Sequence, residues 1–303
     1  MNKNLATFTA SLILFGSNGI VASHIGLPSY DIVILRTFLG AVLLGALLLI
    51  SRKRTKISAN PKSAAFVAIS GMFLGISWLL LFEAYSLVGV GTSSLMYYCG
   101  PVLVMALSPV LFKERLTHTR IAGFAIVLVG VMLVNGGTLQ GGLSPQGLTY
   151  GAVAALCLAA MIVFNKKAEG IGGLENAFIQ IGSAFITALV GTVALHGLSI
   201  DVQPTDWPAI LMLGFVNTGL GCYLYFGSMG KLKAQTVAVC GYIEPVCAVV
   251  MAMAFLGEGM SVLQVLGALL VITGAAATEL APLITRAFVS RHEKTRISPS
   301  PAQ

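Results

Sequence analysis

Long apolar runs separated by short polar segments dominate the pattern along the chain. One helix needs about 20 apolar residues to cross a hydrocarbon core of about 30 Å, whereas the strands of a membrane barrel alternate in polarity over about ten residues. We therefore predict an all-α integral membrane protein with ten transmembrane helices. The predicted spans are 5–25, 31–50, 64–87, 92–112, 120–138, 147–165, 175–196, 208–228, 235–256 and 261–281.

The basic residues mark one side of the membrane. With the first residue inside, every Lys and Arg except Arg36 falls in a segment on the inner side. Basic residues in short loops stay in the cytoplasm, so the pattern predicts a multi-pass protein of the plasma (inner) membrane with both termini cytoplasmic. The alternative is a signal peptide cleaved near Ala22, which leaves nine spans and breaks the repeat described next.

The same features occur twice along the chain, 144 residues apart. The matched pairs are Asp31 with Glu175, Pro101 with Pro245, Glu114 with Glu258, Gly123 with Gly267 and Gly130 with Gly274. Each half holds five spans, an odd number, so the second half enters the membrane inverted, as in many secondary transporters. We predict repeats over residues 1–139 and 147–281, followed by a basic, disordered cytoplasmic tail over 282–303.

The composition agrees with a membrane protein. Hydrophobic residues make up 56% and charged residues 10% of the 303 residues, and the mean hydropathy is +0.90, which excludes an ordinary soluble domain. The net charge of +7 does not indicate nucleic-acid binding, because the basic residues lie in short loops between spans. The expected partners are the lipid bilayer and a small-molecule metabolite, with no nucleic acid.

No catalytic or metal-binding pattern accompanies the spans. The four histidines, His24, His118, His196 and His292, fall at span ends or in loops on both sides of the membrane. HExxH, GxSxG and Walker A motifs do not occur. We expect no metal, no cofactor and no enzymatic activity; a membrane-embedded enzyme or a non-transporting subunit is the least favoured alternative.

One acid stands near the middle of a span. Glu244 lies about nine residues into the ninth span, where a charge costs on the order of 2.5–3.5 kcal/mol. Its counterpart in the first half is Gly100, so the duplicated scaffold does not require an acid there. We predict that Glu244 faces a central cavity as a ligand for a substrate amine or as a proton carrier. The alternative is a buried acid that hydrogen-bonds Tyr242, Tyr97 or Tyr98.

Prolines stand at equivalent positions of the fourth and ninth spans. Pro101 and Pro245 each remove a backbone hydrogen bond and clash with the preceding turn. Carbonyl groups freed at that depth need protein or cavity water as partners. We interpret the two prolines as helix hinges beside the cavity; a kink that only helps packing is the alternative.

Further residues are candidates for the cavity and its entrance. Arg36 in the second span and Glu83 in the third both lie near the outer surface, which suits an ion pair, a gate or a clamp for a substrate carboxylate. Polar and aromatic side chains in other spans predict a cavity for an amphipathic organic solute, although each suits helix packing as well. These candidates are Tyr97, Tyr98, Tyr242, Asn18, Trp78, Asn217 and Tyr223.

Two stretches of the chain resemble a known family. The fourth and ninth spans, YYCGPVLVMALSPVLFKERLT and YIEPVCAVVMAMAFLGEGMS, are each followed by a glycine-spaced helix, IAGFAIVLVGVMLVNG and VLQVLGALLVITGAAA. With ten spans in two inverted halves, they resemble the EamA branch of the drug/metabolite transporter superfamily over about residues 5–280. The resemblance implies a carrier that exposes one cavity alternately to the two faces of the membrane, with Glu114 and Glu258 as structural acids at helix ends.

The function expected from the residues and the resemblance is secondary active transport of small organic metabolites. Amino acids or related compounds are the first candidates, in the direction of export. Protons are the candidate coupling ion. A carrier for lipophilic cations, drugs or a lipid intermediate is the alternative.

Overall fold

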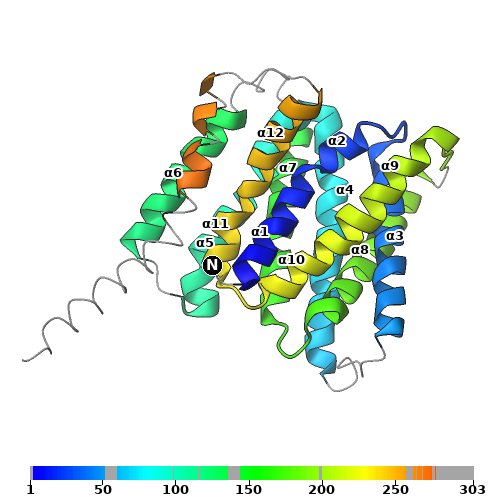
Figure 1. Ribbon diagram of the computed structural model, residues 1–303, viewed down its shortest axis with the longest axis horizontal. Helices are drawn as coiled ribbons and strands as arrows, with labels where there is room; N and C mark the ends of the chain where they lie inside the picture. The colour runs from blue at the N-terminus through cyan, green and yellow to red at the C-terminus, as the bar shows by residue number, and fades with distance from the viewer. Residues whose placement is uncertain are drawn as a thin grey trace, which may run out of the picture.

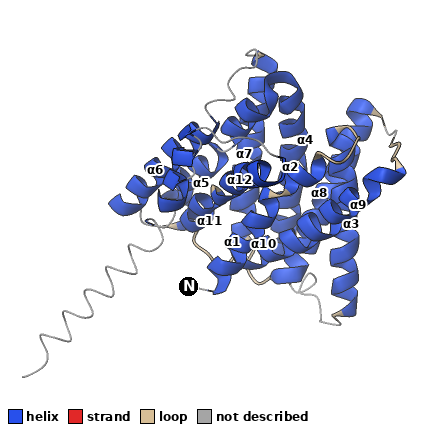
Figure 2. Ribbon diagram, turned by 45° about the horizontal axis from the view of Figure 1, so that its top comes forward, coloured by secondary structure: helices blue, strands red, loops and turns tan. Residues whose placement is uncertain are grey.

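The computed structural model describes residues 3–51, 60–97, 99–114, 117–135, 144–197, 200–256, 262–263, 265–267, 269–274 and 277. Over these residues the protein is built of helices, and Figure 2 shows no strand among them. Tyr98, Glu258 and the tail over 282–303 lie outside the described residues. The predicted all-α class is therefore confirmed for the part of the chain that the structure describes.

Six of the described helical stretches are long and apolar enough to span a membrane. They are Lys3–Ala22, Ser29–Ile50, Pro61–Ala84, Pro145–Lys167, Gly173–His196 and Pro204–Met229. Three shorter apolar helices accompany them, Cys99–Phe112, Ile121–Gly130 and Val265–Gly274. The protein is a multi-pass membrane protein, as the hydrophobic pattern predicted.

The first half of the chain contains helices α1 to α6. Their bounds are α1 Lys3–Gly16, α2 Asn18–Ala22, α3 Ser29–Ile50, α4 Pro61–Tyr97, α5 Cys99–Phe112 and α6 His118–Asn135. The sequence predicted a helix end between 87 and 92, but α4 continues to Tyr97, because the stretch from 85 to 97 contains neither a proline nor a charged residue that would stop it. Pro101 falls in the first turn of α5, where its missing N–H costs no intrahelical bond.

The second half contains α7 to α12, the short 3-10 helix η2 and the π-helical segment η3. Their bounds are α7 Pro145–Lys167, α8 Gly173–His196, η2 Pro204–Asp206, α9 Trp207–Leu211, η3 Met212–Leu220, α10 Gly221–Met229, α11 Ala234–Gly241 and α12 Ile243–Leu256. The η3 segment is a π-helix, a wide turn that is common at functional sites. Because α12 begins 144 residues after α5, Pro245 repeats the position of Pro101 in its helix.

The two halves pack through equivalent pairs of helices. In Figure 1, α1 runs beside α10 and α12, and the equivalent helix α7 packs on α4 and α5. Likewise α3 packs on η3, and its equivalent α8 packs on α4. These reciprocal contacts place the two halves around a shared centre.

Glycines bring α6 against the last described apolar helix. A methyl group on Gly130 would lie 2.6 Å from the carbonyl oxygen of Gly267, and one on Gly274 would lie 2.7 Å from that of Gly123. Small residues allow membrane helices to approach this closely. In the sequence repeat, Gly123 matches Gly267 and Gly130 matches Gly274. Each of the two contacts therefore joins one glycine from each matched pair. Figure 1 shows α6 and this last helix, in orange, at one edge of the molecule.

Two predicted spans are interrupted where α1 meets α12. The first span is divided into α1 and α2, and the ninth into α11 and α12. Ser17 ends α1, and both its N–H and its hydroxyl donate to the carbonyl of Leu14, at 3.1 and 2.7 Å. Tyr242 separates α11 from α12. The helices approach closely at Gly16, where a methyl group would lie 2.6 Å from Cβ of Cys247. The break in the first span therefore lies against the first turns of α12.

Candidate functional site

A cavity of ≈ 570 Å³ lies among helices of both halves. Its wall is formed by α1 to α5 of the first half and by α7, η3, α10, α11 and α12 of the second, and it reaches the α2–α3 connection at Ile25 and Leu27. Most of the wall is apolar. Among the described residues that line it, only Arg36 and Glu244 carry a charge.

Glu244 lines the cavity from the first turn of α12. The interruption between α11 and α12 at Tyr242 places Glu244 at a helix N-terminus, which favours a carboxylate. Among the described residues, no hydrogen-bond donor reaches the Glu244 carboxylate. The acid is therefore available to a molecule that occupies the cavity.

Arg36 contributes the positive charge from α3, and its side chain is held on two sides. Its Nε donates to Oγ1 of Thr218 at 3.0 Å, and its Cζ lies 4.6 Å from the ring centroid of Trp78. Thr218 lies on the π-helical η3, where its hydroxyl donates to the carbonyl of Leu213 at 2.8 Å. These contacts orient the guanidinium at the cavity, whose wall also contains Glu244.

An amide on η3 supports the break in the first span. Nδ2 of Asn217 donates to Oδ1 of Asn18 at 2.9 Å, to Oγ of Ser17 at 2.8 Å and to the carbonyl of Leu14 at 3.2 Å. A helix break at membrane depth requires such partners inside the protein. Because Asn18 lines the cavity, Asn217 stabilises the wall from behind.

The repeat counterparts of the two charged residues serve in packing. A methyl group on Gly100, the counterpart of Glu244, would lie 2.9 Å from the carbonyl oxygen of Ala155, so no larger side chain fits there. Gln180, the counterpart of Arg36, is fully buried and accepts a hydrogen bond from Nδ2 of Asn165 at 3.1 Å. The asymmetry seen in the sequence thus separates cavity residues from scaffold residues.

The other predicted cavity residues lie in different places. Trp78, Tyr97 and Pro101 line the wall together with Asn18, Arg36 and Glu244. Two tyrosines expected in the cavity lie elsewhere: Tyr223 is 39% exposed on the outer surface of α10, and Tyr242 is fully buried in the hydrophobic core.

Tyr225 lines the cavity where the sequence predicted Tyr223. Two residues along a helix differ in direction by about 200°, so only one of the two tyrosines faces inward. The ring of Tyr225 packs against Phe8 and Phe15, with centroid distances of 4.8 and 5.7 Å. Tyr225, Phe226 and Cys222 were not predicted to line the cavity, although their spacing of three and four residues is typical of one helix face.

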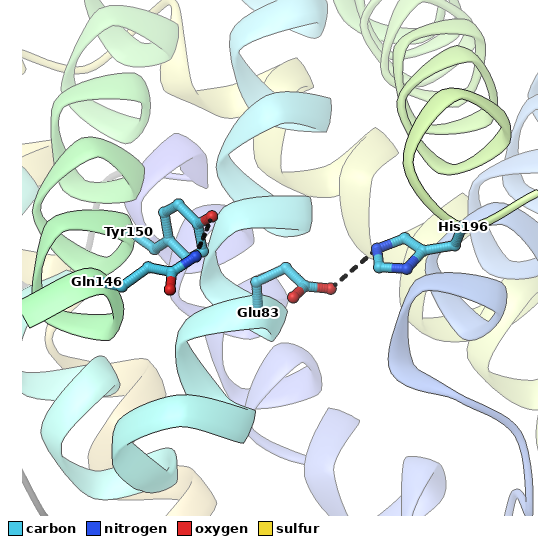
Figure 3. Close-up of polar contacts among 4 residues, drawn as sticks. All are labelled: Glu83, Gln146, Tyr150 and His196. Atoms are coloured by element: carbon cyan, nitrogen blue, oxygen red, sulfur yellow. Dashed lines mark hydrogen bonds and ion pairs between the residues drawn. The ribbon is translucent and has the colours of Figure 1, made fainter. Parts of the chain in front are cut away.

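Glu83 has a different partner from the one predicted. Its Oε1 lies 3.2 Å from Nε2 of His196, the last residue of α8 (Figure 3). The imidazole of His196 also stacks on Tyr30, with centroids 4.4 Å apart and planes 4° apart. Through His196, Glu83 of α4 is therefore linked to the end of α8 and the start of α3, whereas Arg36 contacts Thr218 and Trp78.

Two long polar side chains tie helix ends together about one turn beyond the cavity residue Val237. Oε1 of Glu114 accepts a hydrogen bond from the backbone N–H of Ala234 at 2.7 Å. Nζ of Lys166, at the end of α7, donates to the carbonyl of Leu232. These contacts join α5, α7 and the start of α11 at the end of the bundle opposite the α2–α3 connection.

A cavity between two related halves of a helical membrane protein is typical of membrane transporters. A family model for EamA-like transporters matches residues 3–136 and 145–279. The chain therefore belongs to the EamA-like transporter family, and the resemblance seen in the fourth and ninth spans is confirmed. Membership indicates a transporter of small molecules rather than an enzyme.

The names of individual relatives also indicate a transporter. The chain is 25% identical over 272 residues to the uncharacterized transporter YxxF of Bacillus subtilis, covering 88% of this chain and 86% of the relative. It is 28% identical over 195 residues to a protein of Salmonella typhimurium named "Probable amino-acid metabolite efflux pump", covering 61% of this chain and 65% of the relative. A solved crystal structure matches with a TM-score of 0.77 at 20% identity, covering 92% of this chain and 98% of the other, and shows the fold alone.

Proposed function

We propose that the protein is a secondary active transporter that exports small organic metabolites, amino acids or related compounds first, by alternating access. The observation that carries the proposal is the cavity between the two halves, with the acid Glu244 in its wall. Carriers built from inverted repeats bind their substrates at such an interface. The volume of ≈ 570 Å³ suits a small organic molecule better than a bare ion.

The topology that we propose is ten transmembrane helices in two inverted five-helix repeats, over residues 1–139 and 147–281, in the plasma membrane. Both termini are cytoplasmic in this arrangement, which the distribution of basic residues supports. The α2–α3 connection then lies outside, and the contacts of Glu114 and Lys166 lie on the cytoplasmic side. Because the cavity reaches the α2–α3 connection, this topology places it toward the outer face, and we propose that it represents an outward-facing state of the transport cycle.

Glu244 has two proposed roles, as a substrate ligand and as a proton carrier. A lone carboxylate in an apolar wall avoids the cost of its charge by binding a proton or a cationic group. A proton and a substrate ammonium compete for the same acid. This competition couples proton entry to substrate exit.

The name of the Salmonella typhimurium relative supports amino-acid metabolites as the substrate and efflux as the direction. It supports these two points for the present chain only as proposals, because the matched region covers 65% of that relative. The cavity lining provides the independent argument for an amphipathic organic substrate.

An unbiased metabolite comparison tests the proposal. Metabolites are measured inside and outside cells that express the wild-type protein, the Glu244→Gln variant or no protein. We expect at least one small metabolite to accumulate outside wild-type cells but not outside cells with the Glu244→Gln variant. The control variant Glu169→Gln changes an exposed acid of the α7–α8 connection and should behave as the wild type. Identical metabolite profiles with and without the wild-type protein would refute the proposal.

A further inference from the structure

The cavity ends against packed residues at the side of the bundle opposite the α2–α3 connection. On α11 its lining stops at Val237, and Ala234 follows about one helical turn beyond. On α7 the lining stops at Ile162, and Lys166 follows about one turn beyond. Ala234 and the adjacent Gln235 are fully buried. In the topology that we propose, this packing separates the cavity from the cytoplasm.

Three hydrogen bonds cross between the two halves of the chain at this end. The two carboxylate oxygens of Glu114, which follows α5, accept from the backbone N–H groups of Ala234 and Gln235. Nε2 of Gln235 donates to Oγ of Ser108 on α5, at 2.8 Å. The N–H of Glu114 in turn donates to the carbonyl of Ser108, at 3.4 Å. The end of α5 therefore presents one polar edge to the first residues of α11.

A lysine holds the connection that precedes α11. Nζ of Lys166 donates to the carbonyl of Met229, at 3.5 Å, and to that of Leu232. Met229 is the last residue of α10, and Leu232 lies between α10 and α11. Lys166 thus fixes this connection against α7, while Glu114 fixes the start of α11 against α5.

The position of these contacts makes them reversible. A helix leaves its first N–H groups without intrahelical partners, and a carboxylate at that end satisfies them. Glu114 is half-buried at the end of the bundle, so water can replace its carboxylate as the partner of the two N–H groups. Release then costs only the exchange of one set of hydrogen bonds for another, whereas the same release inside the bilayer would leave unpaired groups.

We infer that Glu114 and Lys166 form the cytoplasmic gate of the cavity, and that α11 separates from Glu114 when the cavity opens to the cytoplasm. The inference rests on the proposed transport function, because alternating access requires one end of the cavity to open while the other closes. Loss of a contact that is made only in the closed state shifts the population toward the open state. Removing the carboxylate of Glu114 should therefore expose the cavity to the cytoplasm.

Thiol labelling of the full-length protein in membrane vesicles tests the gate. Val237→Cys places a thiol in the cavity wall, one turn from the contacts of Glu114. A charged, membrane-impermeant thiol reagent reaches the cytoplasmic face in inside-out vesicles and the outer face in right-side-out vesicles. Mass spectrometry that resolves the modified residue separates position 237 from the five native cysteines. With the gate intact, we expect faster modification from the outer face.

Variants of the gate should change the accessibility of the two faces in opposite ways. Glu114→Ala, combined with Val237→Cys, should raise the rate of modification in inside-out vesicles at least roughly fivefold, because two charge-assisted hydrogen bonds of the closed state are lost. It should not raise the rate in right-side-out vesicles. Glu114→Gln keeps one acceptor oxygen and should give a smaller increase, which keeps the test open if the alanine variant does not fold. Lys166→Met should act in the same direction as Glu114→Ala.

Two control variants separate a gate from a contact that only stabilises the fold. Gly130→Ala crowds α6 against Gly267 and serves as a destabilised protein with an intact gate. It should keep the wild-type ratio of the two rates. Glu169→Ala removes an exposed acid of the α7–α8 connection and should match the parent protein with Val237→Cys in both kinds of vesicle.

The outcomes distinguish the gate from the transporter proposal. Equal rates for Glu114→Ala and the parent protein in inside-out vesicles would overturn the gate, as would an increase of the same size from both faces. Faster modification of the parent protein from the cytoplasmic face would also overturn it. Each of these results leaves the transporter proposal intact. That proposal fails separately, if wild-type cells export no metabolite.

Discussion

The carboxylate of Glu114 caps a helix of the other half of the protein, with its Oε1 2.7 Å from the backbone nitrogen of Ala234. Its Oε2 accepts a second hydrogen bond from the backbone N–H of Gln235, at 3.2 Å. Lys113, which lies between the last residue of α5 and Glu114, has the left-handed conformation with φ of 54°. A side chain at the end of the fourth span thus satisfies two N–H groups at the start of α11, which the helix itself leaves unpaired.

Removing this cap should destabilise the protein. We expect Glu114→Ala to lower the free energy of unfolding by about 1–2 kcal/mol, because two N–H groups lose a charged acceptor. Glu114→Gln keeps one acceptor oxygen and should lose less. Thermal unfolding of the purified variants measures the effect, with Glu169→Ala as the control. Equal stability of Glu114→Ala and the control would contradict the capping role.

Neutralising the cavity acid should abolish transport without reducing the amount of folded protein. Glu244→Gln keeps the size of the side chain but removes the charge that binds a proton or an ammonium group. We expect no active flux of the exported metabolite in proteoliposomes and no dependence of the residual flux on pH. Wild-type flux with wild-type pH dependence in this variant would refute the proposed role of Glu244.

Adding one methyl group between the two closely packed glycine helices should be costly. In Gly130→Ala, the new Cβ would lie 2.6 Å from the carbonyl oxygen of Gly267, so one backbone must move, at a cost of about 1–3 kcal/mol. The matched control is Gly182→Ala in α8, where a new Cβ meets no neighbouring atom within 4 Å. That control should gain up to about 1 kcal/mol, because alanine favours a helix over glycine. Thermal unfolding that ranks Gly130→Ala at or above Gly182→Ala would show that the two helices do not pack in this way.

The contact between Glu83 and His196 should contribute little to stability. The side chains of Glu83 and His196 are 34% and 32% exposed, and pairs near the surface contribute about 0–1 kcal/mol. We therefore expect Glu83→Gln, His196→Gln and the double variant to lower the free energy of unfolding by less than about 1 kcal/mol each. A double-mutant cycle measured by thermal unfolding checks the coupling, and a coupling above 2 kcal/mol would show that the pair is a structural element.

Much of the class and part of the site follow from local properties of the sequence. Apolar runs predict membrane helices because the thickness of the bilayer sets their length, whatever the rest of the chain does. The sequence also singles out Glu244 as a candidate functional acid. Its position within the ninth span gives its depth in the membrane, and the 144-residue repeat gives Gly100 as its counterpart, so neither property requires knowledge of the fold. The structure shows the matching physical difference, since Gly100 packs too closely against α7 for a side chain.

The partners of the polar side chains were decided by the tertiary structure. Arg36 contacts Thr218, which lies 182 residues away, and Glu114 caps a helix that begins 120 residues later. The direction of a side chain around its helix depends on helix rotation and on the π-helical turn, so the sequence named Tyr223 where the structure places Tyr225 in the cavity. The sequence by itself determined a membrane protein with a repeated scaffold and one unmatched acid. Only packing between the halves decided that Arg36 and Glu244 share one cavity, because that proximity arises from contacts between distant segments.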